Sequence, residues 1–249
     1  MSCLAGSLSL INKEMKPIWM SSITTVIFDM YDTLVRNDQR RWRRTFQGII
    51  QEQGLDINAS RLWQVWRRED RKFRANRLIR DKPFQTYRQC WRDGFASAFD
   101  TLGLPGDAEA AVDRSIGDLA NRSPFPETMQ AVGVIQENWR TALLSNADDN
   151  FLLPNLSLLG LEFEVVLSSE QARCYKPAPE LFLAMLRRLG VSAQETVYVG
   201  DRQFEDVQGA SGVGMNAIWI NRSKAALDPK IPRPTGQISS LLELPGFLA

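Results

Sequence analysis

The fold expected for this chain depends on one stretch, Val26-Ile-Phe-Asp-Met-Tyr-Asp-Thr-Leu-Val35. It begins as an apolar run, reaches a carboxylate at Asp29 and continues as a polar turn. Such a run is typical of a strand buried on both faces of a parallel sheet, and open sheets of this kind bind ligands at the carboxyl ends of their strands. Asp is disfavoured within strands and is costly to bury unpaired. We therefore interpret Asp29 as functional, the alternative being an Asp that ends the strand and caps a turn.

Later segments follow the same pattern. Residues 141–146 and 196–201 are apolar runs that end in polar side chains, and residues 175–177 precede a helix-patterned run that stops at Gly190. In a doubly wound parallel sheet the carboxyl ends of the strands face one crevice. The sequence therefore predicts an α/β fold of this kind, in which four side chains converge: Asp29, Ser145, Lys176 and Asp201.

This ordered set resembles the motifs of the haloacid dehalogenase (HAD) superfamily. That superfamily carries Asp-x-Asp-x-Thr at the first strand, then a Ser or Thr, then a Lys, and finally Gly-Asp followed by a second acid. The matching residues here are Asp29 to Thr33, Ser145, Lys176, and Gly200-Asp201 with Asp206. The match runs from about Thr24 to Arg222, and it implies a Rossmann-like core with a helical cap inserted after the first strand.

Composition excludes several classes of protein. The chain has 249 residues and no histidine, which removes Ser-His-Asp hydrolysis and His-ligated zinc. Its three cysteines, Cys3, Cys90 and Cys174, lack the spacing of a metal site and are expected to be reduced thiols of a cytoplasmic protein. No stretch approaches the ~20 apolar residues of a membrane span, so no membrane partner is expected.

Residues 36–93 form a basic and aromatic segment. They contain 16 Lys and Arg against 7 Asp and Glu, whereas the whole chain has a net charge of +1. Apolar residues recur at helical spacing, which predicts a helical insert whose aromatic side chains form its own core. The resemblance implies that this insert is a cap. We expect a tail over residues 1–22, a core over residues 23–36 and 124–249, and a cap over residues 37–123.

Three arginines of this segment, Arg67, Arg71 and Arg74, share one helical face. They can present positive charge to an anion, the alternative being that they only solvate the outside of the helix. Val65-Trp66-Arg67 is similar to the segment that supplies the substrate-binding arginine of 2-haloacid dehalogenases. The resemblance therefore implies that Arg67 contacts the substrate.

The resemblance also implies a mechanism. Asp29 would attack the substrate to form a covalent ester or acyl phosphate that water hydrolyses. Polar groups would bind the substrate or stabilise developing charge, and Asp206 would orient the lysine among them: Thr33, Ser145, Asn146 and Lys176. Asp201 beside Asp29 implies Mg²⁺, held by these two carboxylates and the backbone carbonyl of Tyr31.

Tyr31 departs from the phosphatase pattern, which has a second Asp there as general acid. A Tyr with a pKa of about 10 is a poor proton donor at neutral pH, and Asp32 points to the other side of an extended segment. Tyr at this position resembles the 2-haloacid dehalogenases, which use no metal. Those enzymes, however, replace Gly-Asp by a serine pair followed by asparagine, and this chain keeps Gly200-Asp201. The sequence combines features of both patterns.

Three functions remain open. We expect a magnesium-dependent phosphatase acting on phosphate esters or acyl phosphates, because an uncompensated Asp201 would repel both Asp29 and a carboxylate substrate. The second is a metal-independent 2-haloacid dehalogenase in which Arg67 clamps the carboxylate. The third is a catalytically weak protein whose basic, tryptophan-rich insert binds RNA or another polyanion, although such a protein would not need the four converging side chains.

The expected partner is therefore a small anionic substrate, either an organic phosphate or a 2-haloacid. Nucleic acid is not expected. A homodimer is the assembly that we consider.

Overall fold

The structure, a computed structural model, describes residues 23–79 and 82–248. Its core is a six-stranded sheet in the order β3-β2-β1-β4-β5-β6, with every neighbouring pair parallel. The strands are β1 (Thr25–Phe28), β2 (Arg140–Ser145), β3 (Val165–Ser168), β4 (Thr196–Gly200), β5 (Asn216–Ile220) and β6 (Gly236–Ile238). The predicted α/β fold with a doubly wound parallel sheet is confirmed.

Strand β1 lies at the centre of this sheet, which explains its continuous apolar sequence. Val26 and Phe28 pack into the hydrophobic cluster on one face, whereas Ile27 packs into the cluster on the other. Phe28 is level with Leu143 of β2 and Val199 of β4. The residues that follow these three strands therefore lie close together at one edge of the sheet.

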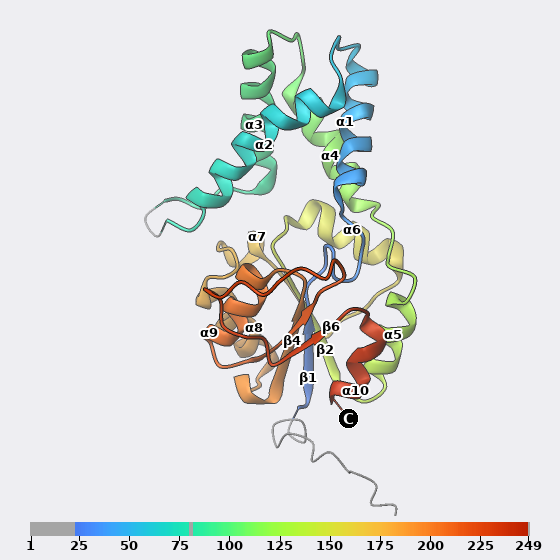
Figure 1. Ribbon diagram of the computed structural model, residues 1–249, viewed down its shortest axis with the longest axis vertical. Helices are drawn as coiled ribbons and strands as arrows, with labels where there is room; N and C mark the ends of the chain where they lie inside the picture. The colour runs from blue at the N-terminus through green and yellow to red at the C-terminus, as the bar shows by residue number, and fades with distance from the viewer. Residues whose placement is uncertain (1–22, 80–81, 249) are drawn as a thin grey trace, which may run out of the picture.

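Helices cover both faces of the sheet (Figure 1). On the face of Val26 lie α5 (Thr128–Gln136), α6 (Asp149–Leu159) and α10 (Leu244–Leu248), and on the face of Ile27 lie α8 (Pro179–Leu189) and α9 (Gly209–Gly212). Helix α8 ends at Gly190, whose φ of 65° is the left-handed conformation that glycine adopts readily. The shorter elements are α7 (Ser169–Ala172), η2 (Ala193–Glu195), the π-helical turn η3 (Gln203–Gln208) and η4 (Leu241–Glu243).

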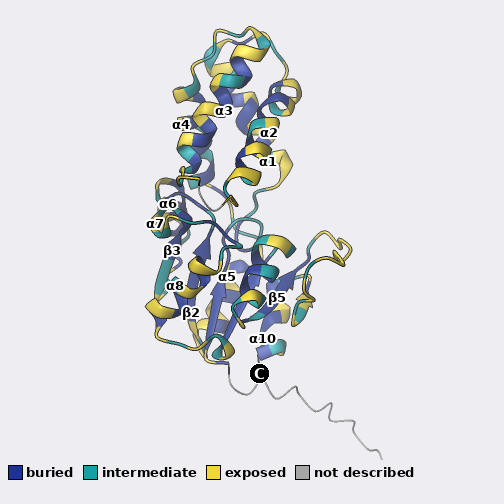
Figure 2. Cartoon of the chain, turned by 90° about the vertical axis from the view of Figure 1, so that its left-hand side faces the viewer, coloured by how far each residue is buried: buried dark blue, intermediate teal, exposed yellow. Residues whose placement is uncertain are grey.

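Four helices form an insert that stands beyond the carboxyl edge of the sheet (Figure 1). They are α1 (Gln39–Gln53), α2 (Ala59–Asn76), α3 (Tyr87–Leu102) and α4 (Ala108–Ala120), and we call them the helical insert. Its interior is buried and its outside exposed (Figure 2). Trp42 lies 5.6 Å from Trp66, and Phe46 lies 5.4 Å from Phe95, as ring centroids. The aromatic side chains thus form the core of the insert, as their spacing predicts.

Two chain segments connect the insert to the sheet, and they run side by side. Val35 pairs with Pro124 in an antiparallel bridge, and Phe125 N donates to Leu34 O at 3.1 Å. The predicted boundaries between core and cap fall on these paired segments, while closure of the insert over the sheet stays a prediction. The predicted tail over residues 1–22 lies outside the described residues. In the part of the chain that the structure describes, no helix is long and apolar enough to cross a membrane.

Candidate active site

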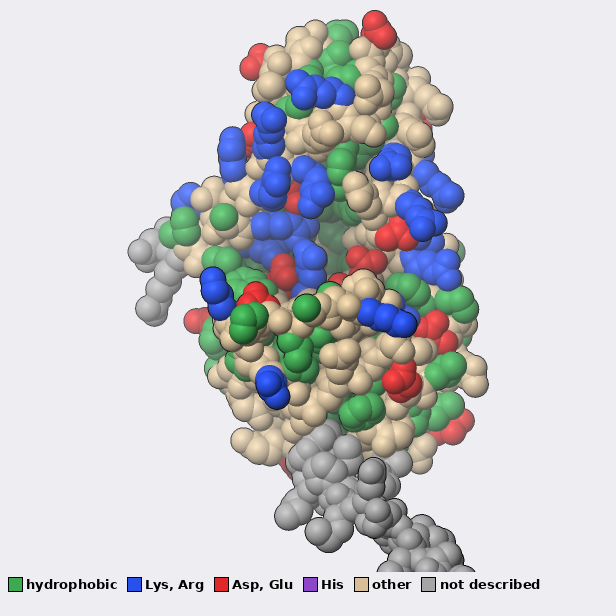
Figure 3. Space-filling view, in the orientation of Figure 1, with side chains coloured by type: hydrophobic (Ala, Val, Ile, Leu, Met, Phe, Trp, Pro, Cys, Tyr) green, Lys and Arg blue, Asp and Glu red, His purple; other side chains and the backbone are tan. Residues whose placement is uncertain are grey.

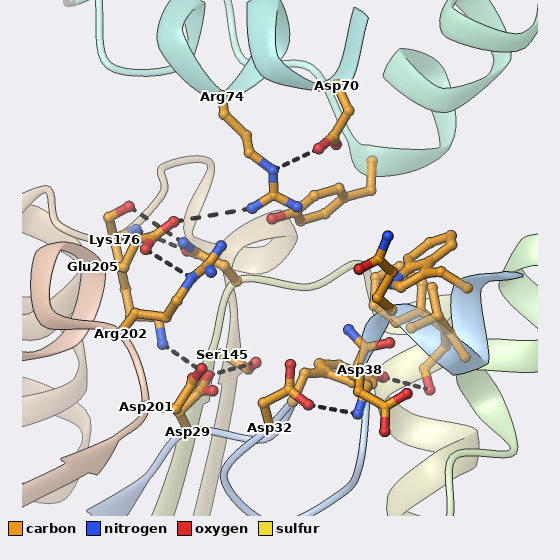
Figure 4. A pocket seen from close by; sticks show the side chains of 18 of the residues that line it. Asp29, Asp32, Asp38, Asp70, Arg74, Ser145, Lys176, Asp201, Arg202 and Glu205 are labelled. Atoms are coloured by element: carbon orange, nitrogen blue, oxygen red, sulfur yellow. Dashed lines mark hydrogen bonds and ion pairs between the residues drawn. The ribbon is translucent and has the colours of Figure 1, made fainter. Parts of the chain in front are cut away.

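Asp29 follows β1 and lies at the floor of a cavity between the sheet and the helical insert (Figure 4). Its backbone N–H donates to Val199 O at 2.9 Å, which fixes the residue against β4. Its Oδ1 accepts from Ser145 Oγ at 2.9 Å and from Lys176 Nζ at 2.8 Å. Within the described residues Oδ2 has no hydrogen bond, so one carboxylate oxygen is anchored and the other remains available.

Lys176 is almost fully buried and sits between two carboxylates. Its Nζ donates to Asp206 Oδ1 at 2.6 Å as well as to Asp29, and to the hydroxyl of Tyr198 at 2.7 Å. Burial lowers the pKa of Lys176, but Asp206 and Asp29 outweigh it, so that the pKa lies well above its ordinary value. The ammonium group therefore stays charged, and Asp206 orients it as the sequence predicts.

Asn146 holds the segment that carries Lys176. Its Nδ2 donates to Lys176 O at 3.2 Å, and its Oδ1 accepts from Lys176 N at 2.8 Å. Both ends of the carboxamide are thus engaged with the backbone, although Asn146 also lines the cavity. Its geometry is that of a positioning residue, and the predicted contact with substrate stays a prediction.

Asp201 follows β4 and carries a buried carboxyl oxygen, Oδ1, that has no hydrogen-bond partner among the described residues. Burial, reinforced by the negative charges of Asp206 and Asp29, raises the pKa of Asp201 well above its ordinary value. The ionised form of this carboxyl group is therefore disfavoured unless a cation or a proton compensates its charge. The glycine before it is required, because a Cβ at Gly200 would overlap the carboxyl group of Asp206.

The same carboxyl groups match the donors that Mg²⁺ prefers. Asp29, Asp201 and Asp206 each offer one oxygen, and these oxygens lie within 4.8 Å of one another. Two of the carboxylate oxygens, Oδ1 of Asp201 and Oδ2 of Asp29, have no hydrogen-bond partner among the described residues and could act as metal ligands. The residues therefore fit a magnesium ion, and the predicted set of Asp29, Asp201 and the Tyr31 carbonyl stays a prediction.

Tyr31 lines the cavity, whereas Thr33 does not. The phenol of Tyr31 donates to Phe151 O at 3.4 Å and its ring meets the Phe151 ring at 5.7 Å. Burial raises the pKa of Tyr31 well above its ordinary value, so the phenol holds its proton at neutral pH. Thr33 is fully buried away from the cavity, which does not support the predicted contact of Thr33 with substrate.

The cavity has a volume of about 430 Å³, with carboxylates on its floor and arginines on its wall. Figure 3 shows Lys and Arg side chains gathered around the hollow. The three arginines predicted to share a face of α2, namely Arg67, Arg71 and Arg74, all line it. Arg74 Nε is paired with Asp70 at 2.8 Å, whereas no carboxylate of the described residues lies within 4 Å of Arg67 or Arg71. Arg71 Nε donates to Arg67 O at 3.3 Å, but neither guanidinium group is neutralised by a carboxylate, so both can bind an anion.

Two acids that sequence reasoning missed connect the insert to the sheet. Glu205 of η3 accepts from Arg77 of α2 at 2.9 Å. Asp148 precedes α6 and accepts from the backbone N–H groups of Tyr87 and Arg88 at 2.9 and 2.8 Å, at the start of α3. Burial raises the pKa of Asp148 to about 6. No local signal marks either acid, because their partners are distant in the sequence.

Comparison with known proteins identifies relatives. A family model for haloacid dehalogenase-like hydrolases matches residues 23–214. The chain is 25% identical over 242 residues to (S)-2-haloacid dehalogenase 1 of Pseudomonas sp. (strain CBS-3), covering 92% of this chain and 98% of that protein. It also resembles the structure of L-2-haloacid dehalogenase from Xanthobacter autotrophicus with chloropropionic acid covalently bound, at a TM-score of 0.73 and 21% identity, covering 91% and 98% of the two chains.

These relatives correct the first functional expectation. Similarity to phosphatases is partial: N-acylneuraminate-9-phosphatase of Rattus norvegicus is 31% identical over 117 residues, covering 46% of this chain and 47% of that protein. The phosphatase prediction was wrong, because the relatives that match along most of this chain are haloacid dehalogenases. The motifs, the parallel sheet and the match over residues 23–214 together show that the chain belongs to the haloacid dehalogenase-like hydrolase family.

Proposed function

We propose that this chain is a 2-haloacid dehalogenase in which Asp29 displaces halide from the substrate. The observation that carries the proposal is the asymmetric anchoring of the Asp29 carboxylate. Oδ1 is held by Ser145 and Lys176, and Oδ2 has no hydrogen bond among the described residues. An anchored carboxylate with one available oxygen is suited to nucleophilic attack. Similarity along most of the chain to (S)-2-haloacid dehalogenase 1 supports the same chemistry.

In the first step, Oδ2 of Asp29 forms a bond to C2 of the haloacid, and the carbon–halogen bond breaks. The halide leaves with the bonding electrons and an ester remains on Asp29. Because halide is a weak base, its departure needs no proton. Burial raises the pKa of the Tyr31 phenol above its ordinary value, which makes it a poor proton donor. This reaction does not need a proton donor at that position.

In the second step, water adds to the carboxyl carbon of the Asp29 ester. The bond from that carbon to the ester oxygen breaks, and a 2-hydroxy acid and one proton are released. Lys176 and Ser145 contact Oδ1 and can stabilise the negative charge that develops on it. Asp206 has its pKa raised by burial to about 6, which suits a proton acceptor near neutral pH.

The carboxylate of the substrate would be bound by Arg67, which lines the cavity and has no carboxylate partner within 4 Å among the described residues. Its guanidinium lies 5.4 Å from the centre of the Trp63 ring, so the indole supports it from one side. Burial raises the pKa of Asp201, which disfavours the ionised form that would repel this substrate.

The proposal also includes magnesium, for which Asp29 and Asp201 would be ligands. When bound, Mg²⁺ would supply positive charge that offsets these carboxyl groups. Mg²⁺ would favour the ionised form of Asp201, because a carboxylate is a better metal ligand than a neutral carboxyl group.

Halide release from 2-chloropropionate tests the proposal, with added magnesium and with chelator, and with Asp29→Asn as the blank. We expect the wild-type protein to release halide both with added magnesium and with chelator, and Asp29→Asn to release none in either medium. One turnover in ¹⁸O-labelled water should place the label in the peptide that contains Asp29, because water attacks its carboxyl carbon. Absence of halide release from a folded wild-type protein in both media would overturn the proposal. Release that requires magnesium would assign the metal a necessary role.

A further inference from the structure

A second cavity adjoins the active-site cavity on the side of the helical insert. It measures about 370 Å³ and lies between α1 and the first half of α2. Gln39, Trp63, Arg67 and Arg71 line both cavities, so the two share a wall. Among the residues that the structure describes, four arginines and no acidic residue line the second cavity, and these arginines are Arg43, Arg67, Arg68 and Arg71.

These arginines differ from the others near the active site. Arg74, Arg77 and Arg202 each contact a carboxylate, with Glu205 common to all three. In residues 23–79 and 82–248, by contrast, no carboxylate lies within 4 Å of the four arginines of the second cavity. Clustered like charges repel, and a bound anion relieves that repulsion. The second cavity therefore has the charge of an anion site.

The start of α2 adds to the positive potential of this cavity. Ala59 and Ser60, the first two residues of the helix, line it. Backbone N–H groups at the start of a helix point outward and favour a negative charge. Asn58 satisfies only the N–H of Arg61 with its side chain.

The combined size of the cavities exceeds that of a small haloacid. A three-carbon 2-chloroacid occupies at most about 180 Å³ if each non-hydrogen atom takes as much room as a water molecule, ~30 Å³. The first cavity alone measures about 430 Å³. Room for a longer substrate therefore continues from Asp29 toward the four arginines.

We propose that the second cavity binds a second anionic group of the substrate, so that the preferred substrates are 2-haloacids with an additional carboxylate or phosphonate at the far end. The inference rests on the proposed dehalogenase function. Arg67 would hold the carboxylate next to the reacting carbon, while Arg43, Arg68 and Arg71 would hold the distant anion. The reacting carbon would lie at Asp29.

Matched substrates test this specificity. Halide release is measured for 2-chloroglutarate against 2-chloropentanoate and for 2-chloroadipate against 2-chlorohexanoate, pairs that differ in the terminal carboxylate. A third substrate, 2-chloro-4-phosphonobutanoate, separates a carboxylate from a phosphonate preference. We expect kcat/KM to be at least about tenfold higher for the better dianionic substrate than for its neutral-tailed partner, as one charged hydrogen bond allows.

Variants connect that preference to the second cavity. Arg71→Gln, and the double change Arg43→Gln with Arg68→Gln, should each reduce the ratio of kcat/KM between dianionic and neutral-tailed substrates by about tenfold. Arg187→Gln, an exposed arginine on α8 outside both cavities, is the matched control and should keep the ratio. Melting temperatures check that all variants fold.

The outcomes separate the two proposals. No halide release from any substrate would overturn the proposed function itself. Halide release with equal kcat/KM for charged and neutral tails, or a preference that survives both arginine variants, would overturn the second anion site alone.

Discussion

Two groups of charged side chains face the same cavity, and they differ in burial and pairing. At the edge of the sheet, the ammonium of Lys176 is 2% exposed and contacts the carboxylates of Asp29 and Asp206. On the helical insert, Arg67 and Arg71 are exposed, and no carboxylate of the described chain lies within 4 Å of them. Buried charges must be paired for the chain to fold, whereas exposed charges need no partner. The sheet thus holds the reacting groups in place, and the insert keeps cations available for the substrate.

The largest effect is expected where the paired group also reacts. Asp29→Asn should lower halide release by about 10⁴-fold or more, because an amide oxygen is a poor nucleophile. The amide has nearly the same shape, so thermal melting should change little. Measured activity close to that of wild type would mean that Asp29 is only a structural partner of Lys176. The paired side chains at the edge of the sheet would then not include the nucleophile.

Removing the buried cation should chiefly affect stability. Lys176→Met leaves Asp29 and Asp206 without a counter-charge, which is expected to cost about 3–5 kcal/mol in the free energy of unfolding at pH 7. The cost should shrink at pH 5, because burial raises the pKa of Asp206 to about 6 and this carboxyl group can then take up a proton. Urea unfolding of the wild type and the variant at pH 7 and at pH 5 measures this loss in free energy of unfolding.

Lys72→Met is the control for that variant. Lys72 is exposed and pairs with Glu69 at 2.8 Å on the surface of α2, so its loss should cost less than about 1 kcal/mol. Equal losses in the two variants would contradict the distinction between buried and exposed charges.

Asp148 links the two regions, and its titration should be measurable. Burial raises its pKa from 3.8 to about 6, so the folded protein binds this proton more tightly than the unfolded chain does. The associated stability is present at low pH and is lost as the pH rises through about 6. Asp148→Asn removes this titration, so its unfolding free energy relative to wild type should be about 1.4 kcal/mol more favourable at pH 8 than at pH 5, because only the last unit of the shift, from pH 5 to about 6, falls within this interval.

Chemical unfolding at pH 5 and pH 8 gives that difference, with the neighbouring Asp149→Asn as control. A relative stability of Asp148→Asn that is independent of pH would show that the carboxyl group does not titrate in this range.

The smallest effect is expected for the exposed arginines of the helical insert. Arg67→Lys should raise KM for 2-chloropropionate by about tenfold, because an ammonium group cannot reproduce the two parallel hydrogen bonds of a guanidinium with a carboxylate. Arg187→Lys on α8 is the control. Unchanged KM together with a normal melting temperature would place Arg67 among the solvated arginines.

Residues that depend on local pattern could be predicted from the sequence. The apolar run before Asp29 predicts a central strand, and the parallel sheet then brings Ser145 and Lys176 to the same edge, as the hydrogen bonds to Asp29 show. The helical spacing of aromatic residues likewise predicts the core of the insert. The burial of Thr33 could not be predicted in this way, because a motif specifies residue types and spacing but not which side chain faces the cavity.

The sequence by itself determined which polar residues follow the predicted strands and in what order. Together with the absence of histidine, these residues predict a hydrolase that uses an aspartate. Only the tertiary structure decided the burial of the Asp201 carboxyl oxygen and which arginines are paired. Hydrophobic pattern is a property of neighbouring residues, whereas pairing and desolvation depend on groups far apart in the chain. Glu205 lies 128 residues from Arg77, and Asp148 lies 61 residues from Tyr87. The two residues of each pair come into contact only when the insert packs against the sheet.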